Sequence, residues 1–550
     1  MSKPVWRRAI LPVLIILSAC GAEDPIPRRV KARLESIFEN GPKEPTPDEV
    51  RVALLRQLRT AAAFPSRKSI DDFYAKHGHR LVWSDPSGKL LPTGTALLDA
   101  LRRAGDHGLN PDDYAVDRLD SLQKGMASGG AERLADFDLL LTSAFFRYAS
   151  DLSTGRLHPD EVQSGWHTNP TELDVAAALD EALAKNDLTK LLESLPPPHP
   201  GYARLRQSLL KLREIDAAGG WPEIPKGPKK VGPSDPRSAL LQKRLDQQDV
   251  AAAIRSFQSL HAIDPDGSLN EETLAAMNVP VGERIRQVEL NLERWRWAPR
   301  DLGDPHVLVN IPGYDLELER ADAQPWRTRV VAGKAYTPTP VFSDRIVALV
   351  IHPPWNVPES IAVKELLPEL LKNPNALDKQ HIRVLEGSGD KAREVDPRAI
   401  RWKDVDPERF PYRLRQDPGD ANPLGHVKFD LTNDFSIYLH DTPAGAVFGR
   451  ADRDVSHGCI RVEKALDLAS RITSDAEKEK MKEALEQPEE QRIELQAKIP
   501  VHILYFTAWA DGAGNLHFGP DVYDFDRSQR AALDKLTSSQ PDLSEAGLHN

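Results

Sequence analysis

Two histidines and one cysteine lie close together in the C-terminal half of this 550-residue chain. His440, His457 and Cys459 all fall within the segment IYLHDTPAGAVFGRADRDVSHGCIRV. A thiol becomes an effective nucleophile when a neighbouring base takes its proton. The chain has only one other cysteine, Cys20, near its amino terminus. We therefore interpret Cys459 as a candidate catalytic nucleophile.

The residues before His440 alternate between apolar and polar types, which predicts a strand. Phe435, Ile437 and Leu439 form its core face. Tyr438 and His440 then share the opposite face, because successive side chains of a strand point to opposite sides. This places the imidazole of His440 at the end of a strand, where it can serve as the base.

The residues after Cys459 have apolar types at helical spacing, which predicts a helix that begins in the SHGCIR turn. These apolar residues are Val462, Ala465, Leu466 and Ala469. The positive end of such a helix would favour a thiolate at Cys459 and an oxyanion beside it. Gly458 fits a tight turn that directs backbone N–H groups toward a substrate carbonyl.

The composition is that of a globular protein with a net negative charge. The formal charge is -11 and the pI is about 5.9. The surface as a whole therefore lacks the positive field that nucleic-acid binding requires. The length suggests about three or four domains.

The first twenty residues, MSKPVWRRAILPVLIILSAC, predict an export signal. The apolar run from Ala9 to Leu17 is shorter than the ~20 residues of a membrane-spanning helix. The ending Leu-Ser-Ala-Cys resembles the lipobox of bacterial lipoproteins, which implies that Cys20 is acylated and anchors a periplasmic protein to the membrane. An ordinary signal peptide with an incidental cysteine is the alternative. An unpaired Cys459 in an oxidising compartment would then require a function.

Hydrophobic patterning divides the chain into helical and mainly-β parts, so the predicted fold class is multidomain α+β. Within the mainly-β part, about 365–427 has little strand pattern and many prolines, which predicts an inserted subdomain or lid near the site. The predicted segments are a signal peptide (1–20), a tether (21–60), a helical domain (61–220), a linker (221–236), a small helical module (237–280), a connecting helix (281–304), the mainly-β domain (305–510) and a tail with a weak helix and a frayed end (511–550).

The spacing from His440 to Ser456-His457-Gly458-Cys459, followed by Ile460-Arg461-Val462, resembles the signature of the L,D-transpeptidases with a YkuD-type catalytic domain. The resemblance extends to NLERWRW, VVAGKAYTPTPVFS and PPWNVPESIA. RLVWSDPSGKL and DHGLNPDDY resemble the helical scaffold domain of the YcbB-like subgroup. FQSLHAIDPDGSLNEETLAAMN resembles a three-helix peptidoglycan-binding-like domain, with a generic helical spacer as the alternative.

The resemblance implies that Cys459 is the nucleophile and His440 its base, with the carbonyl of Asp441 orienting the imidazole. It also implies an oxyanion and substrate-binding set, which consists of Ser456, His457, Gly458, Arg461, Asp441 and Tyr438. The implied reaction releases D-alanine from a stem tetrapeptide and leaves a thioester on the thiol. The side-chain amine of diaminopimelate on an acceptor stem then forms a cross-link. The family requires no metal or organic cofactor, and carbapenems acylate its thiol.

Two other functions are weighed against this one. A zinc-dependent peptidoglycan hydrolase would use the cysteine and histidines as ligands, but the sequence has no ligand spacing typical of zinc sites. Its candidate ligands are His440, His457 and Cys459, with His352 or Asp441 as a fourth. A catalytically silent peptidoglycan-binding lipoprotein would rely on the module at 237–280. His457 could also be structural, and Tyr438 and Trp355 could either line a groove or pack in a core.

Overall fold

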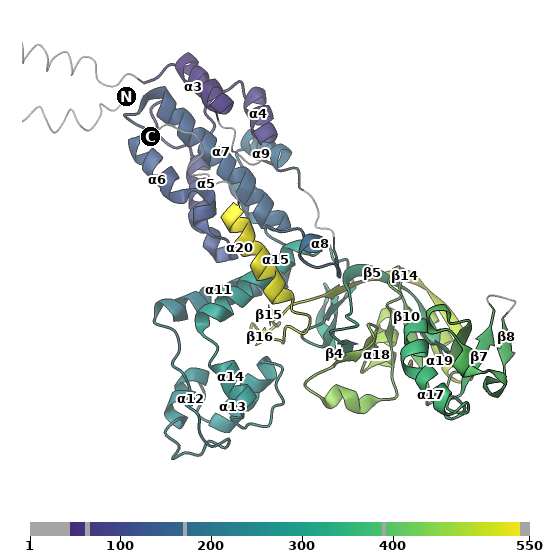
Figure 1. The fold of residues 1–550 in the computed structure, drawn as a ribbon. Helices are drawn as coiled ribbons and strands as arrows, with labels where there is room; N and C mark the ends of the chain where they lie inside the picture. The colour runs from purple at the N-terminus through teal and green to yellow at the C-terminus, as the bar shows by residue number, and fades with distance from the viewer. Residues whose placement is uncertain (1–43, 61–66, 169–172, 388–391, 540–550) are drawn as a thin grey trace, which may run out of the picture. The chain divides into compact units, whose positions relative to one another are not determined.

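The computed structural model describes residues 44–60, 67–168, 173–387 and 392–539 (Figure 1). The chain folds into two compact units. Of the described residues, one unit contains 44–60, 67–95 and 117–143, and the other contains 96–116, 144–168, 173–387 and 392–539. Cys20 and the predicted signal peptide lie outside the described residues, so the lipid anchor stays a prediction.

The first unit is helical. Its elements include α3 (Pro47–Thr60), α4 (Arg67–Lys76), most of α6 (Val116–Gly125) and the first part of α7 (Gly130–Thr154). Val50, Ala53 and Leu54 are buried at helical spacing on α3. The predicted tether is therefore too long at its C-terminal end, because 47–60 has an apolar face that the charged and proline-rich composition obscured.

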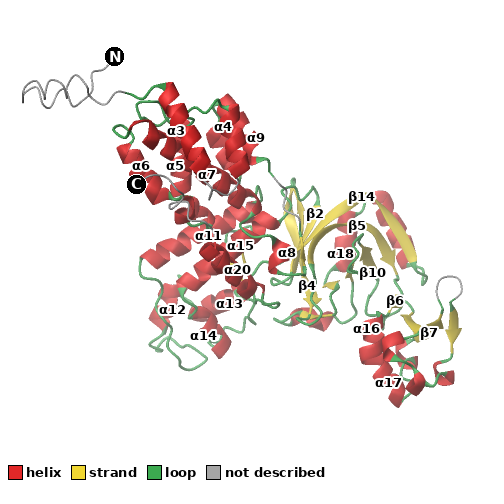
Figure 2. Ribbon diagram, turned by 45° about the horizontal axis from the view of Figure 1, so that its top comes forward, coloured by secondary structure: helices red, strands yellow, loops and turns green. Residues whose placement is uncertain are grey.

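The second unit combines helices with the main sheet, and Figure 2 shows its strands in yellow. α5 has residues in both units. The helices, from α5 onward, are α5 (Pro92–Arg102), α8 (Pro159–Val162), α9 (Val175–Lys185), α10 (Leu188–Ser194), α11 (Pro200–Ala217), α12 (Ser238–Leu245), α13 (Val250–Leu260), α14 (Glu271–Met277), α15 (Val281–Trp297), α16 (Glu359–Ile361), α17 (Leu367–Lys372), α18 (Ala465–Ile472), α19 (Asp475–Leu485) and α20 (Phe525–Ser539).

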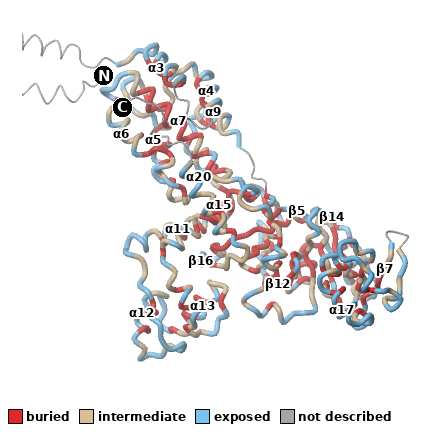
Figure 3. The backbone as a smooth tube through the Cα atoms, viewed as in Figure 1, coloured by how far each residue is buried: buried red, intermediate tan, exposed pale blue. Residues whose placement is uncertain are grey.

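The main sheet closes on itself. Its strands are β1 (Trp166–His167), β2 (His306–Asn310), β3 (Asp315–Arg320), β4 (Ala323–Gly333), β5 (Val341–Ile351), β10 (Val427–Asp430), β11 (Leu439–His440), β12 (Asp454–Ser456), β13 (Ile460–Val462) and β14 (Gln491–Leu504). The order runs β5-β10-β11-β13-β4-β3-β2-β14, and β14 also pairs with β5. Closure removes the free edges that an open sheet would expose. Many residues along the strands are buried, as the red parts of the tube in Figure 3 show.

The sequence correctly predicted most of these strands. The run HVLVNI becomes β2 and the run RIVALVI becomes β5. Their buried residues alternate with others where one face of the strand is buried, and they run continuously where both faces are buried. The run before His440 is the exception, because only Leu439–His440 forms a strand. The Asn433 side chain accepts the N–H groups of Phe435 and Ile437, and Ser436 has a φ of 58°. This side-chain-stabilised loop replaces the rest of the predicted strand.

The predicted helix at Cys459 is also wrong. Ile460–Val462 forms β13, which pairs with β11 on one side and β4 on the other. The helix α18 begins only at Ala465, where Leu468 and Ile472 turn into the core. Apolar residues from a short strand and the following helix had merged into one helical pattern, so no helix N-terminus lies at the thiol.

The inserted segment has more strand structure than the sequence indicated. β6 (Trp355–Asn356), β7 (Ile382–Glu386), β8 (Arg393–Val395) and β9 (Tyr412–Gln416) form a separate antiparallel sheet in the order β6-β9-β7-β8. It has a core of its own, against which Trp355 packs. The interpretation of 365–427 as poor in strands was wrong, because the strands within it, β7, β8 and β9, have only three to five residues each.

The last described segment is better ordered than the predicted weak helix. α20 has 15 residues and begins at the core residue Phe525. The buried guanidinium of Arg294 on α15 contacts Asp526 at 2.7 Å and Gln529 at 2.9 Å. These long-range contacts stabilise a helix whose own sequence is a weak helix former.

The module at 237–280 contains α12, α13 and α14 around a small core that includes Leu241, Ile254 and Met277. This arrangement does not identify a ligand, so its resemblance to peptidoglycan-binding domains stays a prediction. No helix of the described residues is long and apolar enough to cross a membrane.

Candidate active site

The candidate site lies on one face of the sheet, across three neighbouring strands. Leu439 pairs with Ile460 in parallel register, and His440 pairs with Arg461. On the other side of β11, Lys428 pairs with His440. Leu439 and Ile460 are fully buried. The residues next to them along each strand therefore face the opposite side of the sheet.

The same register places Cys459 opposite Tyr438, just before the paired residues. The backbone and side chain of Tyr438 favour the thiolate of Cys459, which opposes part of the effect of burial on the pKa of this thiol. The sulfur also lies 3.8 Å from the carbonyl oxygen of Ser436. Burial raises the pKa of Cys459, so the thiol is protonated at rest and needs a base to become a nucleophile.

His440 has the orientation of a general base. It is 4% exposed, and its Nδ1 donates to the carbonyl oxygen of Asp441 at 2.6 Å. This bond leaves the proton off Nε2, which is then the basic nitrogen. Burial lowers the pKa of His440 to about 4. The resting pair is therefore a neutral thiol and a neutral imidazole.

The low pKa of His440 predicts an unusual acid limit for the reaction. The base form persists well below pH 6.5, so the acylation rate should fall only as pH approaches about 4. As pH falls, the unfolded chain binds a proton at this histidine at a higher pH than the folded chain does. The free energy of unfolding therefore decreases as pH falls from about 6.5 toward 4. Acylation rates between pH 4.5 and 8, with thermal unfolding at each pH, test this prediction. A midpoint near 6.5 in folded protein would contradict it.

The turn that carries Cys459 is held from inside by Ser456. The Ser456 hydroxyl donates to the Cys459 carbonyl at 2.7 Å and accepts the Gly458 N–H at 3.1 Å. Ser456 is buried, so it stabilises the turn rather than facing a substrate. Gly458 has a φ of 116°, which L side chains rarely adopt.

A second support comes from the loop after β4. The buried Thr339 hydroxyl donates to the Gly458 carbonyl at 2.7 Å and accepts the Gly333 N–H at 2.9 Å. Tyr523 bridges the same loop, since its hydroxyl donates to the Gly333 carbonyl at 2.7 Å and accepts the Thr339 N–H at 3.1 Å. Because a trans peptide directs C=O and N–H oppositely, the bond to the Gly458 carbonyl turns the Cys459 N–H away from Thr339.

Thr339→Val should therefore lower kcat/KM for acylation by about tenfold or more, because a loosened turn misplaces the sulfur and its N–H. Thr339→Ser keeps the hydroxyl and serves as the control. We expect the loss to lie mainly in kcat, measured with a stem-peptide donor. Equal rates for the two variants would show that the hydroxyl does not position the turn.

The His457 side chain is not directed toward the candidate nucleophile and base, Cys459 and His440. Its Nε2 contacts the carboxylate of Glu365 in the inserted segment at 2.7 Å. Both side chains are partly exposed. The ring therefore connects the cysteine turn to the insertion, and the sequence could not predict this because the partner lies 92 residues away.

His457→Ala should consequently preserve the chemical step and change mainly substrate binding. We expect kcat to fall less than about tenfold, with a similar effect from Glu365→Gln, because both changes break one contact. Steady-state kinetics of the two variants test this. A loss as large as that of a His440 variant would instead make His457 a participant in proton transfer.

The Asp441 side chain bonds to a neighbouring loop, whereas the Arg461 side chain lies near the thiol. The Asp441 carboxylate accepts the backbone N–H of His426 at 2.8 Å and contacts its ring at 3.1 Å. Its side chain is thus engaged away from His440. Burial lowers the pKa of Arg461, whose Nε has no hydrogen-bond partner among the described residues. An under-satisfied guanidinium beside the thiol suits a substrate carboxylate.

The predicted zinc ligands do not converge. Among the residues that the structure describes, no three His, Cys, Asp or Glu side chains are grouped to hold a metal ion. His440 and His457 are turned to separate partners, as above, and His352 contacts the carbonyl of Leu485 at 3.3 Å. No observation thus favours the zinc alternative.

Sequence reasoning missed three residues of the site. Lys428 lies over the Tyr438 ring, with its Nζ 4.9 Å from the centroid. Its position in the strand HVKFD could have indicated that it shares a face with His440. Thr339 and Tyr523 act through hydrogen bonds between distant segments, and no local pattern predicts these.

A lone thiol and a buried imidazole, which a backbone carbonyl holds in one tautomer, lie on adjacent strands and are the groups that a cysteine acyl-transfer site would need. Comparison with known proteins identifies the family of this domain. Residues 304–495 match the L,D-transpeptidase catalytic domain of the YkuD family, and residues 68–209 match a family model described as a scaffold domain.

A protein of Haemophilus influenzae named "Putative L,D-transpeptidase" is 35% identical over 301 residues. These residues make up 53% of this chain and 59% of that protein, so the chain covers less than two thirds of its relative. Residues 304–495 therefore form a YkuD-type L,D-transpeptidase catalytic domain, and a scaffold domain precedes it. The YcbB-like subgroup stays a prediction.

Proposed function

We propose that this chain is a peptidoglycan L,D-transpeptidase that uses Cys459 as its nucleophile. The observation that supports the proposal is the pairing of β11 with β13, in which His440 lies opposite Arg461 and Leu439 opposite Ile460, the residue after Cys459. The match of residues 304–495 to the catalytic domain supplies the substrate class.

In the first half-reaction, His440 Nε2 takes the thiol proton as sulfur attacks the carbonyl that precedes the terminal D-alanine of a stem tetrapeptide. The Cys459 N–H, turned outward by the Thr339 bond, stabilises the oxyanion. The imidazolium then protonates the leaving amine, and D-alanine departs. A thioester remains on Cys459.

In the second half-reaction, the side-chain amine of diaminopimelate on another stem attacks the thioester. His440 accepts the amine proton and returns it to the departing Cys459 thiolate, so the resting state is restored. Arg461, which is partly exposed and lies two residues after Cys459, binds a carboxylate of the donor stem. No metal or organic cofactor takes part in these steps.

The test is a product analysis with purified disaccharide tetrapeptide. We expect stoichiometric D-alanine release and a dimer whose mass equals two donors minus one D-alanine. Hydrolysed tripeptide without dimer would assign water as the acceptor and contradict the transpeptidase assignment. A disaccharide pentapeptide is the control, because attack there would release a different fragment.

We further propose that the protein is a periplasmic lipoprotein anchored through Cys20. The support is the basic start, the short apolar run and the Leu-Ser-Ala-Cys ending. Metabolic labelling with a fatty acid tests this, with Cys20→Ser as the unlabelled control. Label retained in Cys20→Ser, or none in the wild type, would contradict the anchor. We also propose that the segment of about 365–427 is a lid near the active site and that the module at 237–280 is a peptidoglycan-binding domain.

A further inference from the structure

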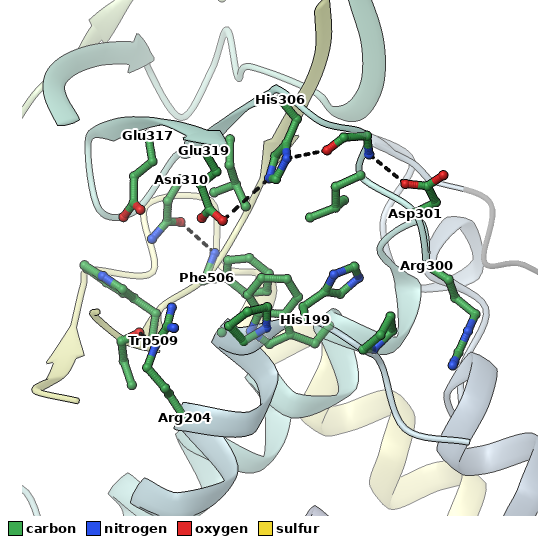
Figure 4. Close-up of a pocket in the computed structure, with 18 of the residues that line it drawn as sticks. His199, Arg204, Arg300, Asp301, His306, Asn310, Glu317, Glu319, Phe506 and Trp509 are labelled. Atoms are coloured by element: carbon green, nitrogen blue, oxygen red, sulfur yellow. Dashed lines mark hydrogen bonds and ion pairs between the residues drawn. The ribbon is translucent and has the colours of Figure 1, made fainter. Parts of the chain in front are cut away.

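The pocket in Figure 4 lies where α11 begins, α15 ends and β2 and β3 run side by side, and its volume is about 280 Å³. Its inner side chains contact one another. Trp295 is stacked on Phe506 at 4.5 Å between ring centroids, and His306 Nε2 lies 3.9 Å from the Glu319 carboxylate. None of the residues assigned to the candidate active site lines this pocket. It therefore adds no group to the reaction at Cys459.

Three basic side chains form a row across the sheet at the candidate active site. Lys428 on β10 pairs with His440 on β11, and His440 pairs with Arg461 on β13. Their neighbours Leu439 and Ile460 are fully buried in the core, so the row faces the opposite side of the sheet. Lys428 thus shares a face with the proposed base.

A second row lies beside the first and contains the thiol. Asp430, Tyr438 and Cys459 are each two positions along the chain from a member of the first row, and side chains two positions apart in a strand share a face. The Ile460 N–H donates to the Tyr438 carbonyl at 3.1 Å, which extends the pairing of β11 with β13 to this row. The sulfur and the Lys428 side chain therefore lie on one face, in adjoining rows.

The Lys428 side chain is directed from its own row toward the row of the thiol. Its Nζ contacts the Asp430 carboxylate at 2.7 Å and lies 4.9 Å from the centroid of the Tyr438 ring. A cation over an aromatic ring is attracted to the negative face of that ring. The Lys428 side chain is 24% exposed, so solvent screens its charge less than it would on the open surface.

The Asp430 carboxylate does not cancel the charge of Lys428, because it also contacts the guanidinium of Arg492. Arg492 in turn contacts Glu494 at 2.6 Å. One carboxylate is therefore shared between two cations beside the thiol row. Arg461, the other cation near the sulfur, is assigned above to a substrate carboxylate, which would neutralise it. Lys428 then remains as the positive charge available to the sulfur.

A fixed positive charge is useful at this place because proton transfer from Cys459 to His440 is unfavourable. Burial raises the pKa of the thiol and lowers the pKa of His440 to about 4. Tyr438 opposes the effect of burial on the thiol most strongly, and the charges of Lys428 and Arg461 act in the same direction. The charged and titratable groups around the thiol are Lys428, Asp430, Tyr438, His440, Arg461, Arg492 and Glu494, with the His457–Glu365 pair on the turn.

We propose that Lys428 is a positioning residue of the reaction, whose ammonium stabilises the Cys459 thiolate that forms when His440 takes the proton. Because opposite charges attract, the ammonium raises the fraction of the thiol that is ready to attack. Asp430 and Tyr438 hold the ammonium in place. The benefit for catalysis rests on the proposed function, whereas the effect on the thiol itself does not.

The test is the rate at which iodoacetamide alkylates Cys459 in the full chain between pH 6 and 10, followed by peptide mass so that Cys20 does not interfere. Below the pKa of the thiol, this rate is proportional to the thiolate fraction. Lys428→Met should therefore lower the rate at pH 8 by about three- to tenfold and move the pH profile to higher pH. Lys428→Arg keeps the charge and should retain most of the rate. Lys185→Met, which removes an exposed ion pair with Glu181, is the matched control and should react as the wild type does.

Asp430→Asn separates the effect of charge from the loss of an ion pair. It removes the carboxylate and leaves both cations, so alkylation at pH 8 should be as fast as in the wild type or faster. Unfolding would expose the thiol and speed its alkylation, so the slower reaction expected of Lys428→Met cannot come from unfolding.

Two outcomes would overturn the inference. One is a Lys428→Met variant that is alkylated at the wild-type rate at pH 8. The other is an Asp430→Asn variant that is slowed as Lys428→Met is, because the ion pair would then act by holding the structure. Alkylation requires no turnover, so slower alkylation of Lys428→Met in a chain that releases no D-alanine would contradict the proposed function alone. A chain that cross-links stem peptides but whose alkylation does not depend on Lys428 would overturn this inference alone.

Discussion

Cys459→Ala is expected to abolish D-alanine release and cross-link formation, with a loss of at least about 10³-fold. Removal of a covalent nucleophile eliminates the thioester pathway altogether, and losses of this size or larger are normal for such residues. No second cysteine lies among the described residues to replace it.

The fold should survive this change. The Cys459 side chain contributes one weak contact to the Ser436 carbonyl, whereas the turn is held by Ser456 and Thr339. We expect the thermal unfolding midpoint to stay within a few degrees of the wild type. Cross-linking by folded Cys459→Ala at the wild-type rate would remove the thiol from the mechanism.

His440→Gln is expected to lower the rate of acylation by about 10²–10⁴-fold, the usual contribution of a positioned general base. Glutamine has a similar length and retains a donor for the Asp441 carbonyl, but it cannot take the thiol proton. Unlike the wild type, the variant depends on thiolate already present. Since burial raises the pKa of Cys459, its residual rate should climb steadily with pH up to alkaline values.

This pH profile separates a catalytic from a structural role for His440. A variant damaged only in folding would show low activity at every pH and a lowered unfolding midpoint. A variant that lacks the base regains activity at high pH with an unchanged midpoint. A flat profile in folded His440→Gln would contradict the assignment of His440 as the base.

The proposed catalytic residues Cys459 and His440 could be predicted from the sequence. Both are of residue types that have few structural uses, and their spacing is recognisable. The core strands could be predicted as well, since β2 and β5 consist of continuous or alternating apolar residues. The environment of the Cys459 thiol could not be predicted from the sequence. The predicted helix N-terminus at Cys459 is a short strand, because pairing with β11 and β4 decides the conformation of Ile460–Val462 rather than local propensity.

Contacts between distant segments account for the remaining differences. Thr339 reaches Gly458 across 119 residues, and Tyr523 reaches Gly333 across 190. The sequence does not decide between a catalytic and a structural role for His457, whose partner Glu365 lies 92 residues away. Such pairs depend on the tertiary fold, which a periodicity of 2 or 3.6 residues does not encode.

Intact-protein mass spectrometry of the chain mixed with a stem tetrapeptide donor shows whether Cys459 forms a thioester. We expect a mass increase equal to the donor minus D-alanine, located on Cys459 by peptide mapping and removed by an amine acceptor. A carbapenem should acylate the same residue irreversibly. D-alanine release with no covalent adduct at Cys459, or an adduct that persists in Cys459→Ala, would contradict the account.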